Sequence, residues 1–174
     1  NAYQHWDYYG PYAVRDDASV SDEQLILESK VNRADHMEFD VIPNLSTYMS
    51  EGKPIFITGD FNEPSHLDWT QEAADAAEVH FQDGRRHGRS VEWQTSKVLS
   101  DAGFVDSYRE IVPIDTDDYD SRGETWVKHG IGYNTETEPF DRIDFVHYFG
   151  DAVVALDSKI VGEIQPTEEQ EAHG

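Results

Sequence analysis

The sequence predicts an α/β fold of layered helices and strands, with a sheet that is mixed and partly antiparallel. Apolar residues at the three- and four-residue spacing of helices alternate with strand-like segments early in the chain, whereas strand-like segments cluster late. A length of 174 residues fits one domain with a sizeable core. We therefore expect residues 1–174 to belong to a single domain.

The first half of the chain predicts two helices. Residues 19–33 form one, with capping candidates before the apolar residues at Ser19, Ser21 and Asp22. Residues 35–49 form the second, because their apolar residues recur every three or four positions. Pro43 lies inside this pattern and should kink or divide the helix, since proline lacks the N–H that an interior position needs.

Two further helices are expected after the first strand. An Ala-rich segment extends to about residue 81 and would be capped by Ser65 or Asp68. A shorter helix over residues 95–102 would end at Gly103, because glycine commonly closes helices.

The clearest strand is the apolar run before Gly59, which ends in Asp60, Phe61 and Asn62. If the extended geometry continued through Phe61, Asp60 and Asn62 would point to the same side and Phe61 into the core. An ionised Asp can hold a hard cation or orient a base, and an Asn amide can donate to a phosphoryl oxygen. The alternative interpretation is a plain turn at the strand end, because Gly, Asp and Asn are all turn residues.

A second polar pattern lies at the start of the strand-like segment 142–149, where Asp141, Arg142 and Asp144 alternate with apolar residues. An inward-facing Asp144 would need a partner such as a histidine or Arg142. The alternative is a solvent-facing alternation on an exposed edge. Residues 124–128 and 152–164 are the other strand candidates.

Composition limits the classes of function. The formal net charge of −23 disfavours binding of bulk nucleic acid, which needs Lys and Arg to neutralise phosphates. One small basic patch is present, and the glycines beside it favour its interpretation as a solvated loop. The patch comprises Arg85, Arg86, His87 and Arg89. Cysteine is absent, so disulfides and thiolate metal sites are excluded. The sequence has no apolar run long enough to span a membrane and no targeting segment.

Three segments in order resemble the endonuclease/exonuclease/phosphatase superfamily, the DNase I-like phosphoesterases. Gly59, Asp60 and Asn62 match its central Gly-Asp-x-Asn pattern, residues 123–126 are similar to its Gly-x-Thr-aromatic segment, and residues 141–145 are similar to its later strand. The resemblance implies a DNase I-like four-layer α/β sandwich with mixed, partly antiparallel sheets. The chain resembles the C-terminal portion of that domain and is expected to be incomplete at both ends.

Two departures from the family pattern accompany this resemblance. His5 resembles the family's strand-borne histidine, although Tyr3 stands where an Asn is usual. The family's main metal-binding Glu precedes that histidine and has no counterpart in this chain, and the closing Ser-Asp-His is absent too. Activity is therefore expected of the complete domain, and the chain alone is expected to be weakly active or inactive.

The resemblance implies a phosphoester hydrolase, either a phosphodiesterase, a phosphatase or a nuclease, that depends on a divalent cation and uses in-line attack by water. The cation would be Mg²⁺, or else Mn²⁺ or Ca²⁺, with Asp60 as a ligand. The implied catalytic residues are His5, Asp60, Asn62 and Asp144, and the candidate substrate contacts are Asn62, Trp126 and Arg142. Asp144, or less favourably Asp141, would position the missing histidine, while Trp126 and Arg142 also fit a structural role.

Substrate and setting are less constrained by the sequence. The acidity favours a small phosphoester, such as a lipid or sugar phosphate, over bulk nucleic acid. A start at Asn1 suggests a processed protein, an excised domain or a fragment. A secreted or periplasmic location is favoured, and the oligomeric state is left open. One alternative is an inactive binding or structural module of the same fold. Another, a calcium-binding module at residues 115–120, lacks the central Gly and terminal Glu of an EF-hand, which favours a solvated loop there.

Overall fold

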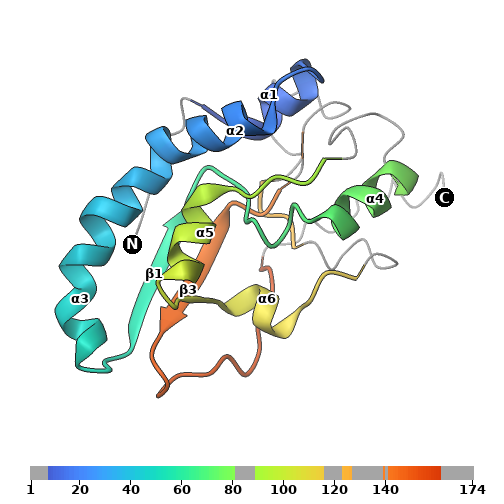
Figure 1. The fold of residues 1–174 in the computed structure, drawn as a ribbon. Helices are drawn as coiled ribbons and strands as arrows, with labels where there is room; N and C mark the ends of the chain where they lie inside the picture. The colour runs from blue at the N-terminus through green and yellow to red at the C-terminus, as the bar shows by residue number, and fades with distance from the viewer. Residues whose placement is uncertain (1–7, 81–88, 116–122, 127–138, 140, 162–174) are drawn as a thin grey trace.

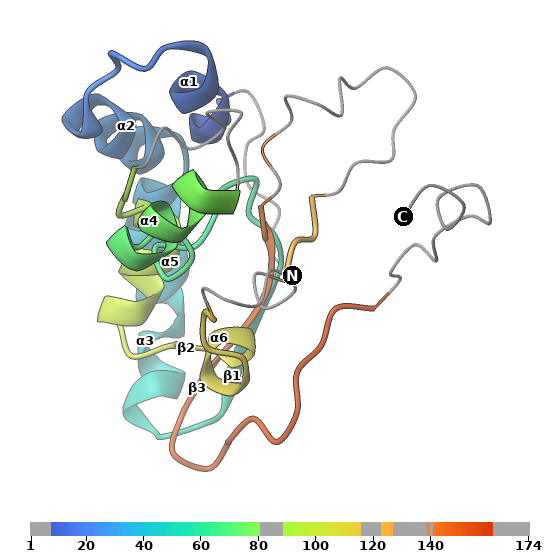
Figure 2. The same ribbon diagram turned by 90° about the vertical axis from the view of Figure 1, so that its right-hand side faces the viewer.

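Helices cover one face of a small antiparallel sheet (Figures 1 and 2). The computed structural model describes residues 8–80, 89–115, 123–126, 139 and 141–161. In Figure 2, helices α2 to α5 lie to one side of the sheet, and the segment that follows the last strand leads away on the other. The predicted α/β class with antiparallel strand pairing is confirmed, and no helix in the described ranges is long and apolar enough to cross a bilayer.

A long helical run begins at an N-cap and continues almost without a break. Ser21 accepts a hydrogen bond from the Gln24 N–H at 3.2 Å, as a capping residue should. The run comprises α2 (Asp22–Ser29), the π-helices η1 (Lys30–Ala34) and η2 (Met37–Val41), and α3 (Ile42–Ser50). Pro43 lies in the first turn of α3, where its missing N–H costs least. Pro43 was predicted to kink or divide the helix. In the structure, the hydrogen bonding changes from π-helical to α-helical just before it, between Val41 and Ile42.

The sheet depends on two strands of equal length. β1 (Ile55–Asp60) pairs antiparallel with β3 (Asp144–Phe149) from the Ile55–Phe149 pair to the Asp60–Asp144 pair. The two-residue strand β2 (Val105–Asp106) pairs with the other edge of β3, so the strand order is β1-β3-β2. The two predicted long strands are confirmed, and their pairing places residues that are 84 to 94 positions apart in the sequence side by side.

The other helices are shorter. Their bounds are α1 (Gly10–Asp16), α4 (Gln71–His80), α5 (Gln94–Asp101) and α6 (Ser107–Ile111). α4 starts after Thr70, whose hydroxyl accepts the Ala73 N–H, and not after the predicted caps Ser65 or Asp68. Gly103 follows α5 with φ +90°, a conformation that favours glycine, as predicted.

The core lies between the sheet and the helical run. It consists of Met37, Ile57, Phe61, Leu99, Phe104 and Phe145. The predicted inward orientation of Phe61 is confirmed, because its side chain is fully buried. On the opposite face of the sheet, Phe56 is 57% exposed and Val146 is 46% exposed.

Two strand predictions are wrong within the described residues. Residues 152–161 carry no strand, and Val154 and Leu156 are exposed there, so their β-forming side chains have no sheet to pack on. Residues 124–126 contain one isolated bridge, between Trp126 and Asp141, and no strand. The remaining residues of both predicted strands lie outside the described ranges.

His147 on β3 predicts a pH dependence of stability. Its ring is buried and stacked on Phe61, and burial lowers its pKa from 6.5 to about 4. At a pH between these two pKa values, His147 is protonated in the unfolded chain and neutral in the folded protein. The unfolding free energy should fall by up to about 3 kcal/mol as the pH drops through this interval.

Urea unfolding of the wild type and His147→Gln between pH 4 and 7 measures this contribution. We expect the variant to lose less stability than the wild type on acidification. Identical losses would contradict a neutral, buried His147.

Candidate functional site

Asp60 and Asp144 are direct partners at one end of the β1–β3 pair. Paired residues point to the same face of a sheet, and this is the face opposite the helices, because Ile57 and Phe145 occupy the other one. Asp144 is exposed and Asp60 is half-buried. Like charges placed directly opposite each other repel, so this arrangement is unfavourable without a positive partner.

The electrostatics of Asp60 reflect this position. Burial raises the pKa of Asp60 and the negative charge of Asp144 raises it further, whereas the Asn62 N–H and the Arg33 guanidinium lower it. The net result is a pKa above the ordinary value, which indicates a carboxylate whose charge is poorly compensated.

Asn62 lies in a tight turn after β1. Its N–H donates to Asp60 Oδ1 at 2.7 Å, and its φ of +48° is left-handed, which is uncommon for a residue other than glycine. β1 ends at Asp60, although the Phe61 N–H still donates to the Ile143 carbonyl at 2.8 Å, and the extended backbone is left at Asn62. Asp60 and Asn62 therefore form a turn at the end of the strand, and this turn is compatible with both interpretations of the sequence, the polar site and the plain turn.

Thr125 joins the Gly-x-Thr-aromatic segment to the start of β3. Its hydroxyl accepts hydrogen bonds from the Ile143 and Asp144 N–H groups, both at 3.0 Å. The Thr125 and Trp126 N–H groups donate in turn to the Asp141 carbonyl, at 3.1 and 2.9 Å. Trp126 is thereby placed next to Asp141, and the segment holds the backbone that carries Asp144.

Asp141 is a buried structural acceptor. Its two carboxylate oxygens accept hydrogen bonds from the Tyr9 hydroxyl and the Trp69 indole N–H, both at 2.8 Å. Asp144 is exposed, so it is the more accessible carboxylate of the two. The preference for Asp144 over Asp141 as the residue that positions a histidine stays a prediction.

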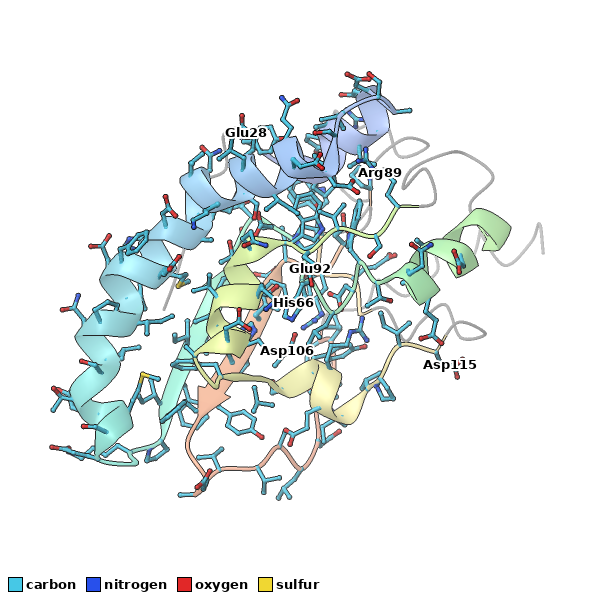
Figure 3. All side chains as sticks on the ribbon, viewed as in Figure 1. Glu28, His66, Arg89, Glu92, Asp106 and Asp115 are labelled. Atoms are coloured by element: carbon cyan, nitrogen blue, oxygen red, sulfur yellow. The ribbon has the colours of Figure 1, made fainter. Side chains whose placement is uncertain are left out.

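Arg142 lies in a buried ion-pair cluster. It forms two hydrogen bonds with Asp68, both at 3.0 Å, and two with Asp106, at 2.9 and 2.7 Å. Arg109 also pairs with Asp68. Burial alone would raise the pKa of Asp106, but Arg142 holds it below its ordinary value. Figure 3 shows Asp106 in the interior of the molecule. We therefore assign Arg142 the structural role.

A second buried ion pair involves Glu63, the residue that directly follows Asn62. Glu63 is 2% exposed and its Oε2 accepts the Thr95 N–H at 3.0 Å. Arg33 Nη1 lies 3.9 Å from Glu63 Oε1. Burial raises the pKa of Glu63, whereas Arg33 and Thr95 act in the opposite direction.

The remaining sequence candidates are distributed as follows. His5 lies outside the described residues, as do Arg85, Arg86 and His87. Arg89 contacts the Val20 carbonyl and the Asp22 carboxylate near the start of α2, so it has a structural partner and is not simply solvated (Figure 3). Within the described part of the chain, no group of three or more His, Asp or Glu side chains gathers closely enough to hold a metal by itself.

The residues that sequence reasoning missed are the buried charges. They are Arg33, Glu63, Asp68, Asp106 and Arg109. Glu63 directly follows the polar pair of the turn, and this adjacency was the available signal. Asp68 lies between Leu67 and Trp69, and Asp106 follows Val105, but such patterns do not show that a charged side chain turns inward, since charged residues are usually solvent-exposed.

The chain is similar to a nematode protein of unknown function. The uncharacterized protein F14F9.5 of Caenorhabditis elegans is 37% identical to this chain over 156 residues. The alignment covers 86% of the chain and 46% of that protein, so the chain spans about half the length of its curated relative. No protein-family model matches the chain, and no solved structure matches it.

The Arg142 cluster predicts a strong effect on stability. Arg142→Met leaves two buried carboxylates with too little positive charge, and we expect it to lower the unfolding free energy by about 3–5 kcal/mol. Urea unfolding followed by circular dichroism measures the change. Lys97→Met is the control, because Lys97 pairs with Asp101 on the surface of α5 and should cost less than about 1 kcal/mol. Equal effects of the two substitutions would contradict the structural role.

Proposed function

We propose that this chain is the C-terminal portion of a DNase I-like domain that hydrolyses phosphoesters with the aid of a divalent cation. The observation that carries the proposal is the direct pairing of Asp60 with Asp144. These residues belong to two of the segments that resemble the family. The third segment is anchored beside them through the hydrogen bonds of Thr125.

The donor set of this end of the sheet fits a divalent cation. The two carboxylates belong to directly paired residues on one face of the sheet and provide hard oxygen ligands, and a cation bound by both would relieve their repulsion. Mg²⁺ commonly takes one or two protein carboxylates and completes its shell with water. A set of two acids is therefore sufficient for Mg²⁺, with Mn²⁺ or Ca²⁺ as alternatives.

Each residue has a separate role in this proposal. A bound cation would supply charge neutralisation at a phosphoryl oxygen. Asp60 would hold it and orient the attacking water, and the Asn62 amide would donate to another phosphoryl oxygen. Asp144 would act as a second ligand or position a histidine. Trp126 follows Thr125, whose hydroxyl accepts the Asp144 N–H, so it stays a candidate substrate contact. His5 keeps its proposed role as proton donor or phosphate contact on the resemblance alone.

The exposed face of the sheet supports the four-layer architecture. Helices cover one face, whereas Phe56 and Val146 are exposed on the other. A four-layer sandwich would place a second sheet over these side chains and so remove them from water. We therefore propose that the described sheet and its helices form one half of such a sandwich.

The substrate class follows from charge. At a net charge of −23, the average field of the molecule opposes approach of a polyanion. We propose a small or lipid- or sugar-linked phosphoester in preference to bulk nucleic acid. The alternative, an inactive module of the same fold, predicts that cations bind without hydrolysis.

The activity test uses the complete domain of which this chain is proposed to be the C-terminal portion, and compares it with its Asp60→Asn and Asp144→Asn variants. Hydrolysis of bis(p-nitrophenyl) phosphate is measured with Mg²⁺, Mn²⁺ and Ca²⁺, and a short DNA duplex serves as a second substrate. We expect each substitution to lower the rate by about 100-fold or more, because each removes a charge aimed at the reacting group. Asp151→Asn is the control, since Asp151 is exposed in the turn after β3. Equal activity in all three variants would refute the assignment.

Cation binding provides an independent test. Asp144→Asn should raise the melting temperature in a chelator by about 1–3 °C, because it removes repulsion from Asp60. The same variant should respond less to added Mn²⁺ than the wild type does. Differential scanning fluorimetry measures both effects. A variant that is less stable in chelator and equally responsive to Mn²⁺ would exclude a site shared by these carboxylates.

A further inference from the structure

The turn that carries Asn62 is followed at once by a buried acid. Glu63 is 2% exposed, and its Oε2 accepts the Thr95 N–H at 3.0 Å in the first turn of α5. A carboxylate in this position ties the turn after β1 to the start of a helix. A burial this deep is unfavourable for a charged group without a positive partner.

Arg33 on η1 is that partner. Its side chain is fully buried, its Nη1 lies 3.9 Å from Glu63 Oε1, and its Nη2 donates to the Tyr8 carbonyl. Its Nε and Nη1 have no hydrogen-bond acceptor in the structure. Glu63 is therefore the carboxylate that forms an ion pair with Arg33 among the described residues.

Asn62 is held between two fixed neighbours. On one side, Phe61 is fully buried and its N–H donates to the Ile143 carbonyl at 2.8 Å. On the other side lies Glu63. The φ of +48° at Asn62 is left-handed, a conformation that asparagine adopts more readily than most residues but that still costs free energy, so fixed neighbours help to hold it. Phe61 provides one anchor and the Glu63–Arg33 pair provides the other.

We propose that Glu63 and Arg33 are positioning residues whose buried ion pair holds the Asp60–Asn62 turn in its conformation. Neither side chain is exposed enough to meet a substrate, so both act through the turn. Their effect on hydrolysis rests on the proposed function. Their effect on the turn itself does not.

The test uses amide hydrogen exchange at Asn62, whose N–H donates to Asp60 Oδ1. The variants are Glu63→Gln, Arg33→Met and the double variant. Glu63→Gln keeps an oxygen for the Thr95 N–H but removes the charge. We expect exchange at Asn62 to accelerate by about tenfold or more in each single variant, and by more than exchange at Phe61.

The double variant separates positioning from charge compensation. It removes both buried charges, so its overall stability should return toward that of the wild type. Asn62 exchange should nevertheless stay faster than in the wild type, because the attraction that holds Glu63 in place is gone. If both stability and Asn62 exchange return to wild-type values, the pair only compensates charge and the proposal is overturned. If a single variant does not fold, the double variant alone decides.

A matched control comes from an exposed pair on the same helical run. Lys30 Nζ and Glu38 Oε2 are also 3.9 Å apart, but their side chains are 46% and 42% exposed. Lys30→Met with Glu38→Gln should leave exchange at Asn62 unchanged. In the phosphodiester assay, Glu63→Gln should lower kcat with little change in KM. Absence of hydrolysis by the wild type would refute the proposed function and leave the exchange result to judge the positioning role.

Discussion

The antiparallel pairing of β1 with β3 is the constraint on which the site depends. Its register places Asp60 opposite Asp144, and a slip of one residue would move every side chain to the other face. The core fixes this register, because Ile57 and Phe145 must both face the helices. The same constraint that buries apolar side chains on one face therefore brings two carboxylates together on the other.

Buried charges reinforce this arrangement from both ends of the site. Arg142, next to the start of β3, is held by Asp68 and Asp106, which anchors the strand that carries Asp144. Glu63 and Arg33 lie beyond the end of β1. Such pairs contribute little net stability compared with apolar residues, but they are costly to break, so they favour one geometry over its alternatives. The carboxylates of the proposed site are exposed or half-buried above this framework.

Sequence patterns predicted the elements with strong local signals. The apolar runs before Asp60 and after Asp144 gave the two long strands, and Ser21 and Gly103 marked the ends of helices. Short elements such as α1 and α6 were not predicted, because a helix of five to seven residues depends on tertiary contacts and has little pattern of its own. The predicted strand over residues 152–164 is absent from its described part, 152–161, because β-forming residues make a strand only where a neighbouring strand pairs with them.

The proposed site could be predicted only in part. Asp60, Asn62 and Asp144 were identified as candidates, but their separation along the chain gives no distance, and only the pairing of the strands makes Asp60 and Asp144 neighbours. Arg142 was a candidate for substrate contact as well as for structure. Its two carboxylate partners lie 74 and 36 residues away, so the sequence alone could not decide between these roles.

The most direct test of the central claim is a crystal structure of the chain soaked in Mn²⁺, with anomalous diffraction data to locate the metal. The account predicts an anomalous peak between the carboxylates of Asp60 and Asp144, and no peak there in a crystal of Asp144→Asn. A peak at another site, or an unoccupied Asp60–Asp144 pair at a saturating Mn²⁺ concentration, would contradict it.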